Sequence, residues 1–449
     1  MQETLKKNDE IEVDVTRLGA NGEGVANFNG KVIFVPFVLP GEKAKIHIIN
    51  DKNSFLVAKL VELKTKSDAR IMPKCPYFEK CGGCDIQHLD YAHQLKLKTE
   101  IVRDSLSKYA KIDFDVPLAV SSENEFRYRN KFAFPVQNEN GELKIGMYRK
   151  NSHNIIPIDD CLLQSENAKV ILKLFKEYML ENKISAFDEK THKGLVKHIV
   201  VRENGSQFIL TVVVTDEKFD SFNPLVEKLK TQFSSFGVVK NINKLNNNVI
   251  FGEKDVWIYG LKELELSEFG INYFVSNRSF LQVNDDVKHK IYEKIIEFSS
   301  EKDYIIDAYS GAGLLSSVLA KHAKNVVGVE IVKQATDNAN KLKELNHLEN
   351  LTNINGDCAI VLPKLIQNEK NDFLVVLDPP RKGVDKKVLQ AILDAKPSEI
   401  IYLSCNPATL ARDLTELVKE YNLDFVQPYD MFPQTANVET LVKLSLKYE

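Results

Sequence analysis

The sequence has no long hydrophobic run, no excess of positive charge and few cysteines. No apolar stretch in its 449 residues approaches the length that spans a membrane, and the polar start MQETLKKNDE lacks the apolar core of a signal peptide. We therefore expect a cytoplasmic protein with no membrane-embedded part. The formal net charge is −3, so any surface that binds a polyanion has to be a local patch.

Internal repeats and low-complexity segments are also missing, and the patterning predicts several domains. Residues 1–63 alternate short apolar and polar runs between glycines and prolines, which predicts a small β-barrel. Residues 64–74 are polar and are interpreted as a linker. Residues 75–267 mix strand and helix patterns, which predicts a central α/β domain.

One segment of the central region, residues 88–110, has helical periodicity. Four apolar or aromatic residues fall on a single stripe of this helix: Leu95, Val102, Leu106 and Tyr109. A helix with such a stripe needs a surface to cover, and we expect it to pack on the C-terminal domain.

The remaining residues, 268–449, have the most regular pattern. Apolar runs predict strands near residues 304–308, 326–329, 373–377 and 400–403, and helical stretches separate them. Strands that alternate with helices predict a doubly wound, Rossmann-like α/β sheet. The chain is therefore expected to be multidomain, with the α/β sheet as its last domain.

Acidic residues and glycines follow the first three of these C-terminal strands. The turn YSGAG, with Gly311 and Gly313, lets the backbone approach a ligand closely, although a Gly-Ala-Gly turn alone is a weak signal. Glu330 ends the second strand, where a carboxylate can accept hydrogen bonds from ribose hydroxyls, and Asp357 follows the third. This set favours S-adenosylmethionine over a phosphate-rich dinucleotide.

The next two strands end in residues that indicate chemistry. The strand FLVVL leads into Asp378-Pro-Pro, a signature of amino-methylating enzymes that is normally followed by an aromatic residue, but Arg381 stands there. Cys405, in LSCNP, sits at a strand-to-helix turn, where a polar helix entrance is expected to lower the thiol pKa. A thiolate can activate C5 of uracil for methylation by adding to C6. Alternatively, Cys405 is a small buried core residue.

Three runs near the C-terminus, DPPRKG, SCNPATLARD and NVETLVKL, resemble the RNA uracil-5-methyltransferases, and the upstream SFLQVN and FRYRNK are similar to theirs. The resemblance covers nearly the whole chain. It implies that Cys405 is the nucleophile, that Glu439 is the base that removes the C5 proton, and that five residues hold S-adenosylmethionine: Gln282, Tyr309, Glu330, Asp357 and Asp378. From its residue type alone, Glu439 could equally be a solvated charge.

Four of the six cysteines form a second candidate site. Three lie close together in CPYFEKCGGC, and a fourth lies far downstream: Cys75, Cys81, Cys84 and Cys161. Four thiolates suit an iron–sulfur cluster, and zinc is the alternative. The resemblance favours a 4Fe–4S cluster with a structural or RNA-positioning role.

RNA is the expected partner. The N-terminal barrel resembles the TRAM domain, an RNA-binding module. Basic and aromatic or apolar residues alternate in two central segments, and six basic side chains there are candidates for phosphate contacts: Arg127, Arg129, Lys131, Lys197, His198 and Arg202. The same alternation is typical of a half-buried strand.

The barrel is typical of the ribosomal branch of the family, which implies large-subunit (23S) ribosomal RNA as the substrate. A transfer-RNA methyltransferase is the nearest alternative, and a non-catalytic RNA-binding or ribosome-assembly factor is an alternative of another class. Every expected catalytic residue lies in this one chain, so we expect it to act as a monomer.

Overall fold

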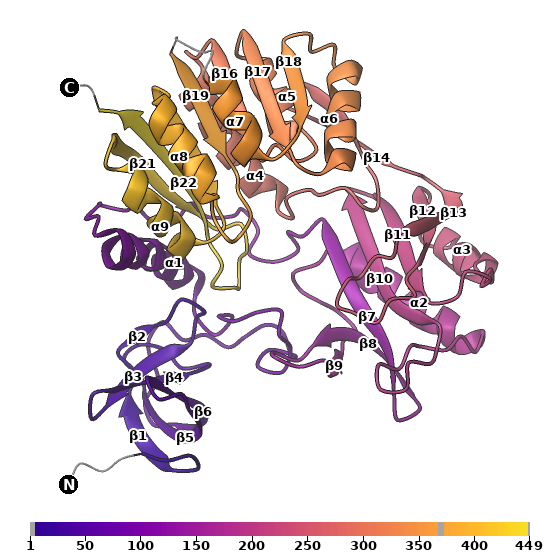
Figure 1. Cartoon of the computed structure of the whole chain (residues 1–449). Helices are drawn as coiled ribbons and strands as arrows, with labels where there is room; N and C mark the ends of the chain where they lie inside the picture. The colour runs from indigo at the N-terminus through magenta and orange to yellow at the C-terminus, as the bar shows by residue number, and fades with distance from the viewer. Residues whose placement is uncertain (1–4, 367–371, 448–449) are drawn as a thin grey trace.

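The structure is a computed structural model that describes residues 5–366 and 372–447. Its N-terminal part is a small β-sheet unit, its middle a larger sheet with two helices on it, and its C-terminal part an α/β domain (Figure 1). Within the described residues, no helix is both long enough and apolar enough to cross a membrane.

The N-terminal unit is a sheet that curls on itself. Six strands of the described chain form it: β1 (Glu10–Asp14), β2 (Arg17–Leu18), β3 (Gly24–Phe28), β4 (Lys31–Val35), β5 (Lys43–Asp51) and β6 (Phe55–Leu63). Their order is β1-β5-β6-β4-β3-β2, and β1 also lies against β3. Alternate residues such as Ala44, Ile46 and Ile48 point inward and are fully buried. The predicted β-barrel pattern is thus present.

The central sheet has the order β13-β12-β11-β10-β7-β8-β9. Its described strands are β7 (Lys131–Glu139), β8 (Glu142–Tyr148), β9 (Ile155–Pro157), β10 (Val196–Asn204), β11 (Gln207–Val214), β12 (Phe236–Ile242) and β13 (Lys254–Gly260). Helices α2 (Glu166–Glu181) and α3 (Asn223–Lys230) share a core with one face of the sheet, through Phe134 and Val201 among others. A hairpin, β14 (Leu264–Glu268) with β15 (Ile271–Val275), leads onward.

The C-terminal sheet has the order β18-β17-β16-β19-β20-β22-β21. Its described strands are β16 (Tyr304–Ala308), β17 (Asn325–Glu330), β18 (Leu351–Asn355), β19 (Phe373–Leu377), β20 (Glu399–Ser404), β21 (Tyr421–Tyr429) and β22 (Glu439–Leu446). The first five in this order are parallel, whereas β22 is antiparallel to β20 and to β21. The direction of winding reverses between β16 and β19, and ligands of such sheets bind at the carboxyl ends of the strands at this place.

Helices cover both faces of this sheet. One face packs on α4 (Asp285–Ser299), α5 (Leu314–Ala320) and α6 (Lys333–Leu345), and the other on α7 (Cys358–Ile366), α8 (Lys386–Ala395) and α9 (Pro407–Leu417). The second face also receives α1 (Tyr91–Ser105), which follows the cysteine-rich segment and packs against α9 and β21 (Figure 1).

The predicted stripe on α1 holds only in part. Val102 and Leu106 are buried in the core of the C-terminal domain, but Tyr109 is 61% exposed. Residues Leu106–Ala110 form a single turn of π-helix, η1, which has more residues per turn than an α-helix. The wider turn brings Ala110 to the core in place of Tyr109, so the prediction for Tyr109 is wrong.

Candidate active site

A cavity of about 760 Å³ opens at the carboxyl edge of the C-terminal sheet. All seven residues predicted for catalysis and cofactor binding line it, each from a different strand end or neighbouring segment: Gln282, Tyr309, Glu330, Asp357, Asp378, Cys405 and Glu439. Five of the seven lie at or just after the ends of parallel strands, which all end at this edge, whereas Gln282 precedes α4 and Glu439 begins the antiparallel β22.

Cys405 is held between a strand and a helix. Strand β20 ends at Ser404, and the Asn406 side chain caps α9 by accepting a hydrogen bond from the Ala408 N–H at 3.1 Å. Pro407 is the first helical residue, where its fixed φ suits the helix start. These constraints leave Cys405 half-buried at the cavity wall.

The electrostatic surroundings of Cys405 differ from the prediction. Burial raises the pKa of the thiol, Glu439 and Asp378 raise it further, and Arg381 lowers it. The predicted lowering is therefore wrong for the free protein, because desolvation and two carboxyl groups outweigh the helix entrance and the guanidinium. Arg381 is the cation that favours the thiolate.

Glu439 is the first residue of β22. Because β22 runs antiparallel to β20, with Thr440 opposite Ser404, its start lies beside the end of β20 and so beside Cys405. Glu439 is only 4% exposed, which excludes the interpretation as a solvated charge. Burial, and next Asp378, raise the pKa of Glu439 to about 8, whereas Arg381 lowers it. The carboxyl group is mostly protonated at neutral pH.

Two more carboxyl groups lie deep at the same edge. Asp378 follows β19, and burial raises its pKa to about 7. Asp307 in β16 accepts a hydrogen bond from the Ser316 hydroxyl, and burial and the nearby Asp378 raise its pKa to about 7. Acidic groups crowded in this way favour a positively charged ligand, which would lower their pKa values.

Two of the expected cofactor residues, Glu330 and Asp357, accept hydrogen bonds from backbone N–H groups. Glu330 accepts hydrogen bonds from the N–H groups of Gly311 (3.0 Å) and Val332 (2.7 Å), so it joins the glycine turn to β17. Tyr309 has a φ of 67°, a left-handed conformation that is costly for a tyrosine and recurs at functional sites. Asp357 is exposed and accepts a hydrogen bond from the Ala359 N–H at 2.9 Å.

Several lining residues were not predicted from the sequence. Lys288 and Tyr292 come from α4, Phe280 precedes Gln282, and Phe432 and Asn437 come from the loop between β21 and β22. Phe280 and Asn437 lie inside SFLQVN and NVETLVKL, so those runs offered a signal for them. Phe432 had none, because it reaches the cavity only through the path of its loop.

The four predicted cluster cysteines lie near one another in the fold. The charges of Cys75, Cys81 and Cys161 all raise the thiol pKa of Cys84, and burial raises the pKa of every one of the four, to about 11 for Cys81. Backbone N–H groups of Tyr77 and Phe78 favour the thiolate of Cys75, and Gly83 does so for Cys81.

These thiols are a suitable donor set for an iron–sulfur cluster, because buried thiolates that accept N–H bonds are its usual ligands. As they stand, however, no group of three or more side chains among the described residues is arranged to hold a metal ion. The cluster therefore stays a proposal.

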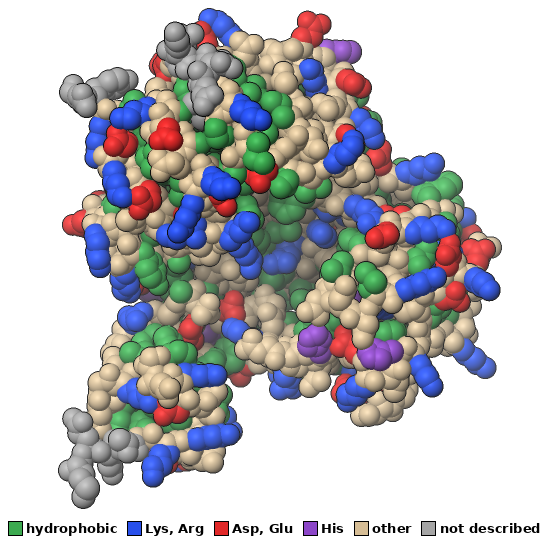
Figure 2. Space-filling model, viewed as in Figure 1, with side chains coloured by type: hydrophobic (Ala, Val, Ile, Leu, Met, Phe, Trp, Pro, Cys, Tyr) green, Lys and Arg blue, Asp and Glu red, His purple; other side chains and the backbone are tan. Residues whose placement is uncertain are grey.

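Four of the six candidate phosphate contacts fall into two groups. Arg127 forms two hydrogen bonds with Asp160 and donates to the Cys161 carbonyl at 3.0 Å, and Arg202 is 1% exposed, so both serve the protein interior. Lys197 and His198 instead line a second cavity of about 760 Å³ on the central sheet, together with Arg149 and Lys150. On the face seen in Figure 2, Lys and Arg side chains lie in and around a hollow between the central and C-terminal domains.

The comparison with protein families gives two matches. Residues 90–447 match the model of the tRNA (Uracil-5-)-methyltransferase family. The chain belongs to this family. Residues 5–61 of this methyltransferase match the TRAM domain, which confirms the resemblance of the N-terminal barrel.

Relatives of the methyltransferase extend over its whole length. An uncharacterized RNA methyltransferase of Listeria innocua is 38% identical over 448 residues, 99% of each chain, and one of Clostridium tetani is 36% identical over 447 residues, 98% of this chain and 97% of the relative. Among solved structures, the Pyrococcus abyssi tRNA (uracil-54, C5)-methyltransferase in complex with S-adenosyl-L-homocysteine superimposes with a TM-score of 0.78. It is 26% identical and covers 97% of this chain and 100% of its own. The protein is thus an S-adenosylmethionine-dependent RNA methyltransferase.

Proposed function

We propose that the protein methylates C5 of a uridine in RNA through a covalent adduct with Cys405. The observation that carries this proposal is the meeting of Cys405, Glu439 and Asp378 at one cavity wall. The Cys405 thiolate forms a bond from Sγ to C6 of the uracil, and the electron pair of the C5–C6 double bond moves to give an enolate that is nucleophilic at C5. S-adenosylmethionine, when bound, would supply the methyl group that C5 takes, and its sulfur–methyl bond would break to leave S-adenosylhomocysteine.

Glu439 completes the cycle. Its carboxylate takes the proton from C5, the C5–C6 double bond forms again, and the Sγ–C6 bond breaks to return the thiolate of Cys405. A carboxyl group with a pKa near 8 is well matched to proton transfer near neutral pH. The residues proposed to hold S-adenosylmethionine are Gln282, Tyr309, Glu330, Asp357 and Asp378.

A uridine within folded RNA has to leave its stack to reach Cys405. The thiol lies at a cavity wall rather than on a flat surface, so we infer that the target base is flipped into the cavity. The exposed ring of Phe280, 79% accessible at the cavity mouth, is a suitable surface for an unstacked base.

We propose large-subunit (23S) ribosomal RNA as the substrate, from the resemblance to the ribosomal branch. Transfer RNA is the second candidate, favoured by the likeness to the Pyrococcus abyssi enzyme. The match to that enzyme covers 97% of this chain, so it includes most of the N-terminal barrel. The barrel therefore supports ribosomal RNA without excluding transfer RNA, and the experiment below decides between them. A cytoplasmic location and a monomeric state stay predictions.

The test is direct. Purified protein is incubated with S-adenosylmethionine and unmodified 23S ribosomal RNA or transfer RNA, and 5-methyluridine is quantified by mass spectrometry after digestion. We expect 5-methyluridine in ribosomal RNA with the wild type and none with Cys405→Ala. Methylation of transfer RNA alone would contradict the substrate, and methylation of neither would favour a binding factor.

We further propose that Cys75, Cys81, Cys84 and Cys161 hold a 4Fe–4S cluster. Buried thiols with raised pKa values remain protonated without a metal, whereas a bound metal deprotonates its thiol ligands. Iron and sulfide in anaerobically purified protein, together with broad absorbance at about 400 nm, would support the cluster. A stoichiometric zinc content without iron would contradict it.

A further inference from the structure

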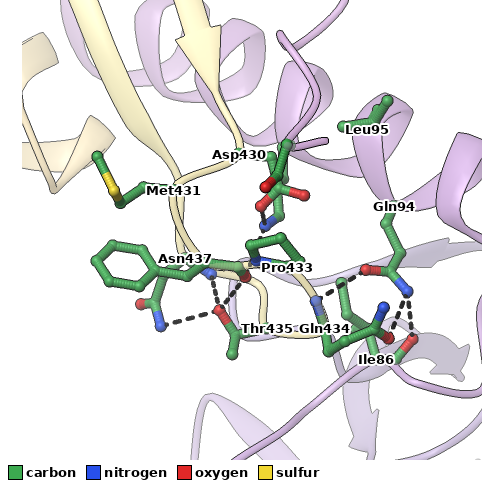
Figure 3. Close-up of polar contacts among 12 residues, drawn as sticks. Ile86, Gln94, Leu95, Asp430, Met431, Pro433, Gln434, Thr435 and Asn437 are labelled. Carbon is green, nitrogen blue, oxygen red and sulfur yellow. Dashed lines mark hydrogen bonds and ion pairs between the residues drawn. The ribbon is translucent and has the colours of Figure 1, made fainter. Parts of the chain in front are cut away.

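The loop between β21 and β22 is held mainly by segments outside the C-terminal domain. This junction loop, residues 430–438, carries Phe432 and Asn437 into the active-site cavity and leads directly into Glu439. Figure 3 shows the polar contacts that surround it. The side chains of Asp430 and Gln434 are buried, so these contacts are made away from water.

Consecutive carbonyl groups of the junction loop accept hydrogen bonds from distant segments. The Phe432 carbonyl accepts from Lys98 of α1 at 3.0 Å, and the Pro433 carbonyl from the hydroxyl of Tyr128 at 3.1 Å. The Gln434 carbonyl accepts from the backbone N–H groups of Asp85 (3.1 Å) and Ile86 (3.2 Å). Because Asp85 directly follows Cys84, the cysteine segment and the junction loop are joined through main-chain atoms.

The side chain of Gln94 links α1, the segment after the cysteines and the junction loop. Its amide N–H₂ donates to the side-chain oxygen of Gln434 (3.0 Å), and its oxygen accepts from the Gln434 N–H (3.1 Å). The same amide donates to the carbonyls of Ile86 (3.2 Å) and Leu89 (2.9 Å). Gln434 has a φ of 71°, and buried polar contacts of this kind hold such a conformation in place.

We propose that Gln94 and Gln434 are positioning residues for methyl transfer, and that the junction loop transmits the state of the cysteine cluster to the active site. A change around Cys84 moves Asp85 and Ile86, and these move the Gln434 carbonyl. The displaced loop then carries Phe432, Asn437 and Glu439 away from their productive positions. The proposal rests on the methyl-transfer function above.

The first test is Gln94→Leu, which keeps the size of the side chain and removes both polar atoms. We expect kcat for RNA methylation to fall by about tenfold to a hundredfold, the size of effect that a small misplacement of reacting groups produces. The KM for S-adenosylmethionine should stay unchanged, because its proposed ligands lie on other elements. Gln427→Leu is the matched control: it removes a comparable amide, which donates to the Leu118 carbonyl at 2.8 Å, from β21 outside the junction loop.

The second test needs no activity. Hydrogen–deuterium exchange of the amides in residues 431–438 is compared between wild type, Gln94→Leu and Cys84→Ser. We expect faster exchange in both variants and wild-type exchange in Gln427→Leu. If Cys84→Ser does not fold, wild-type protein treated with an iron chelator and an oxidant replaces it.

Unchanged exchange of the junction loop after loss of Cys84 or of bound metal would overturn the coupling to the cysteines. An unchanged kcat in Gln94→Leu would overturn the positioning role. The RNA used is whichever one the wild type methylates, so failure of the proposed substrate is recognised separately.

Discussion

Cys405 and Glu439 both have to lose a proton to act, yet their surroundings favour the protonated forms. Burial is the main cause of the raised pKa of each group, and neighbouring carboxyl groups raise both pKa values further. Arg381 lowers the pKa of both groups. It occupies the position after Asp-Pro-Pro where amino-methylating enzymes carry an aromatic residue, and we infer that its charge makes covalent chemistry possible near neutral pH.

Removal of this charge should shift the pH dependence. In Arg381→Met the pKa values of Cys405 and Glu439 rise, so a larger pH is needed for the same fraction of thiolate and carboxylate. We expect the rise of kcat/KM for RNA with pH to move to higher pH, on the order of one unit. Lys386→Met removes an exposed cation at the start of α8 and should leave the profile in place. An unshifted profile in Arg381→Met would refute this role.

Glu439→Gln should separate adduct formation from adduct release. The amide cannot accept the C5 proton, so the methylated RNA stays bonded to Cys405, and turnover falls by about a hundredfold to ten-thousandfold. A denaturing gel should show a band of protein with RNA attached, absent in Cys405→Ala. An unshifted band with Glu439→Gln would remove Glu439 from the role of eliminating base.

For single residues, the sequence predicted the position of a side chain better than its pKa. The seven expected site residues line one cavity, and their positions were predictable because strand ends and family motifs can be recognised in the sequence. The thiol pKa of Cys405 was not predictable in the same way. It depends on groups from β19, β20 and β22 that meet only in the folded chain, and on the depth of burial.

Among the elements, α1 shows where periodicity ends. The 3.6-residue pattern placed Val102 and Leu106 correctly. The π-turn that follows has more residues per turn than this pattern assumes, so a different residue, Ala110, faces the core. Four strands of the C-terminal sheet, β16, β17, β19 and β20, were predicted to within one residue at each end, since continuous apolar runs mark buried parallel strands. The junction loop has no such pattern, and its contacts join residues more than 300 positions apart.

Lys98 and Asp430 form an ion pair between α1 and the junction loop, with both side chains fully buried. We expect Lys98→Met to reduce the free energy of unfolding by about 3–5 kcal/mol, because Asp430 is left as an unpaired buried charge. The double variant Lys98→Met with Asp430→Leu should recover much of this loss. Urea unfolding measures both. Equal losses of unfolding free energy in the single and double variants would show that the unpaired charge of Asp430 is not the cause of the loss.

Across the whole molecule, the second cavity adds a basic surface to the central sheet. Arg149 and Lys150 line it, and Lys150 forms an ion pair with the partly buried side chain of Asp85 at 2.6 Å. If RNA crosses this surface, Arg149→Ala with Lys150→Ala should weaken RNA binding several-fold. The slope of the logarithm of the binding constant against the logarithm of salt concentration should become smaller by about two, one for each lost phosphate contact.

The control for this pair lies on the other side of the sheet. Lys173 and Lys176 are exposed on α2, which packs on the opposite face. Lys173→Ala with Lys176→Ala removes the same charge and should leave RNA affinity unchanged in fluorescence anisotropy. Equal weakening by both pairs would indicate a general effect of net charge rather than a contact surface.

The reversal of strand order between β16 and β19 has a kinetic consequence. Tyr309, Glu330 and Asp357 lie at the carboxyl ends of β16, β17 and β18 on one side of the reversal, whereas Cys405 and Glu439 lie on the other. The methyl donor and the uracil are thus expected to occupy neighbouring halves of one cavity, with Asp378, which follows β19, at their boundary. Neither has to wait for the other, so we expect the two substrates to bind in random order.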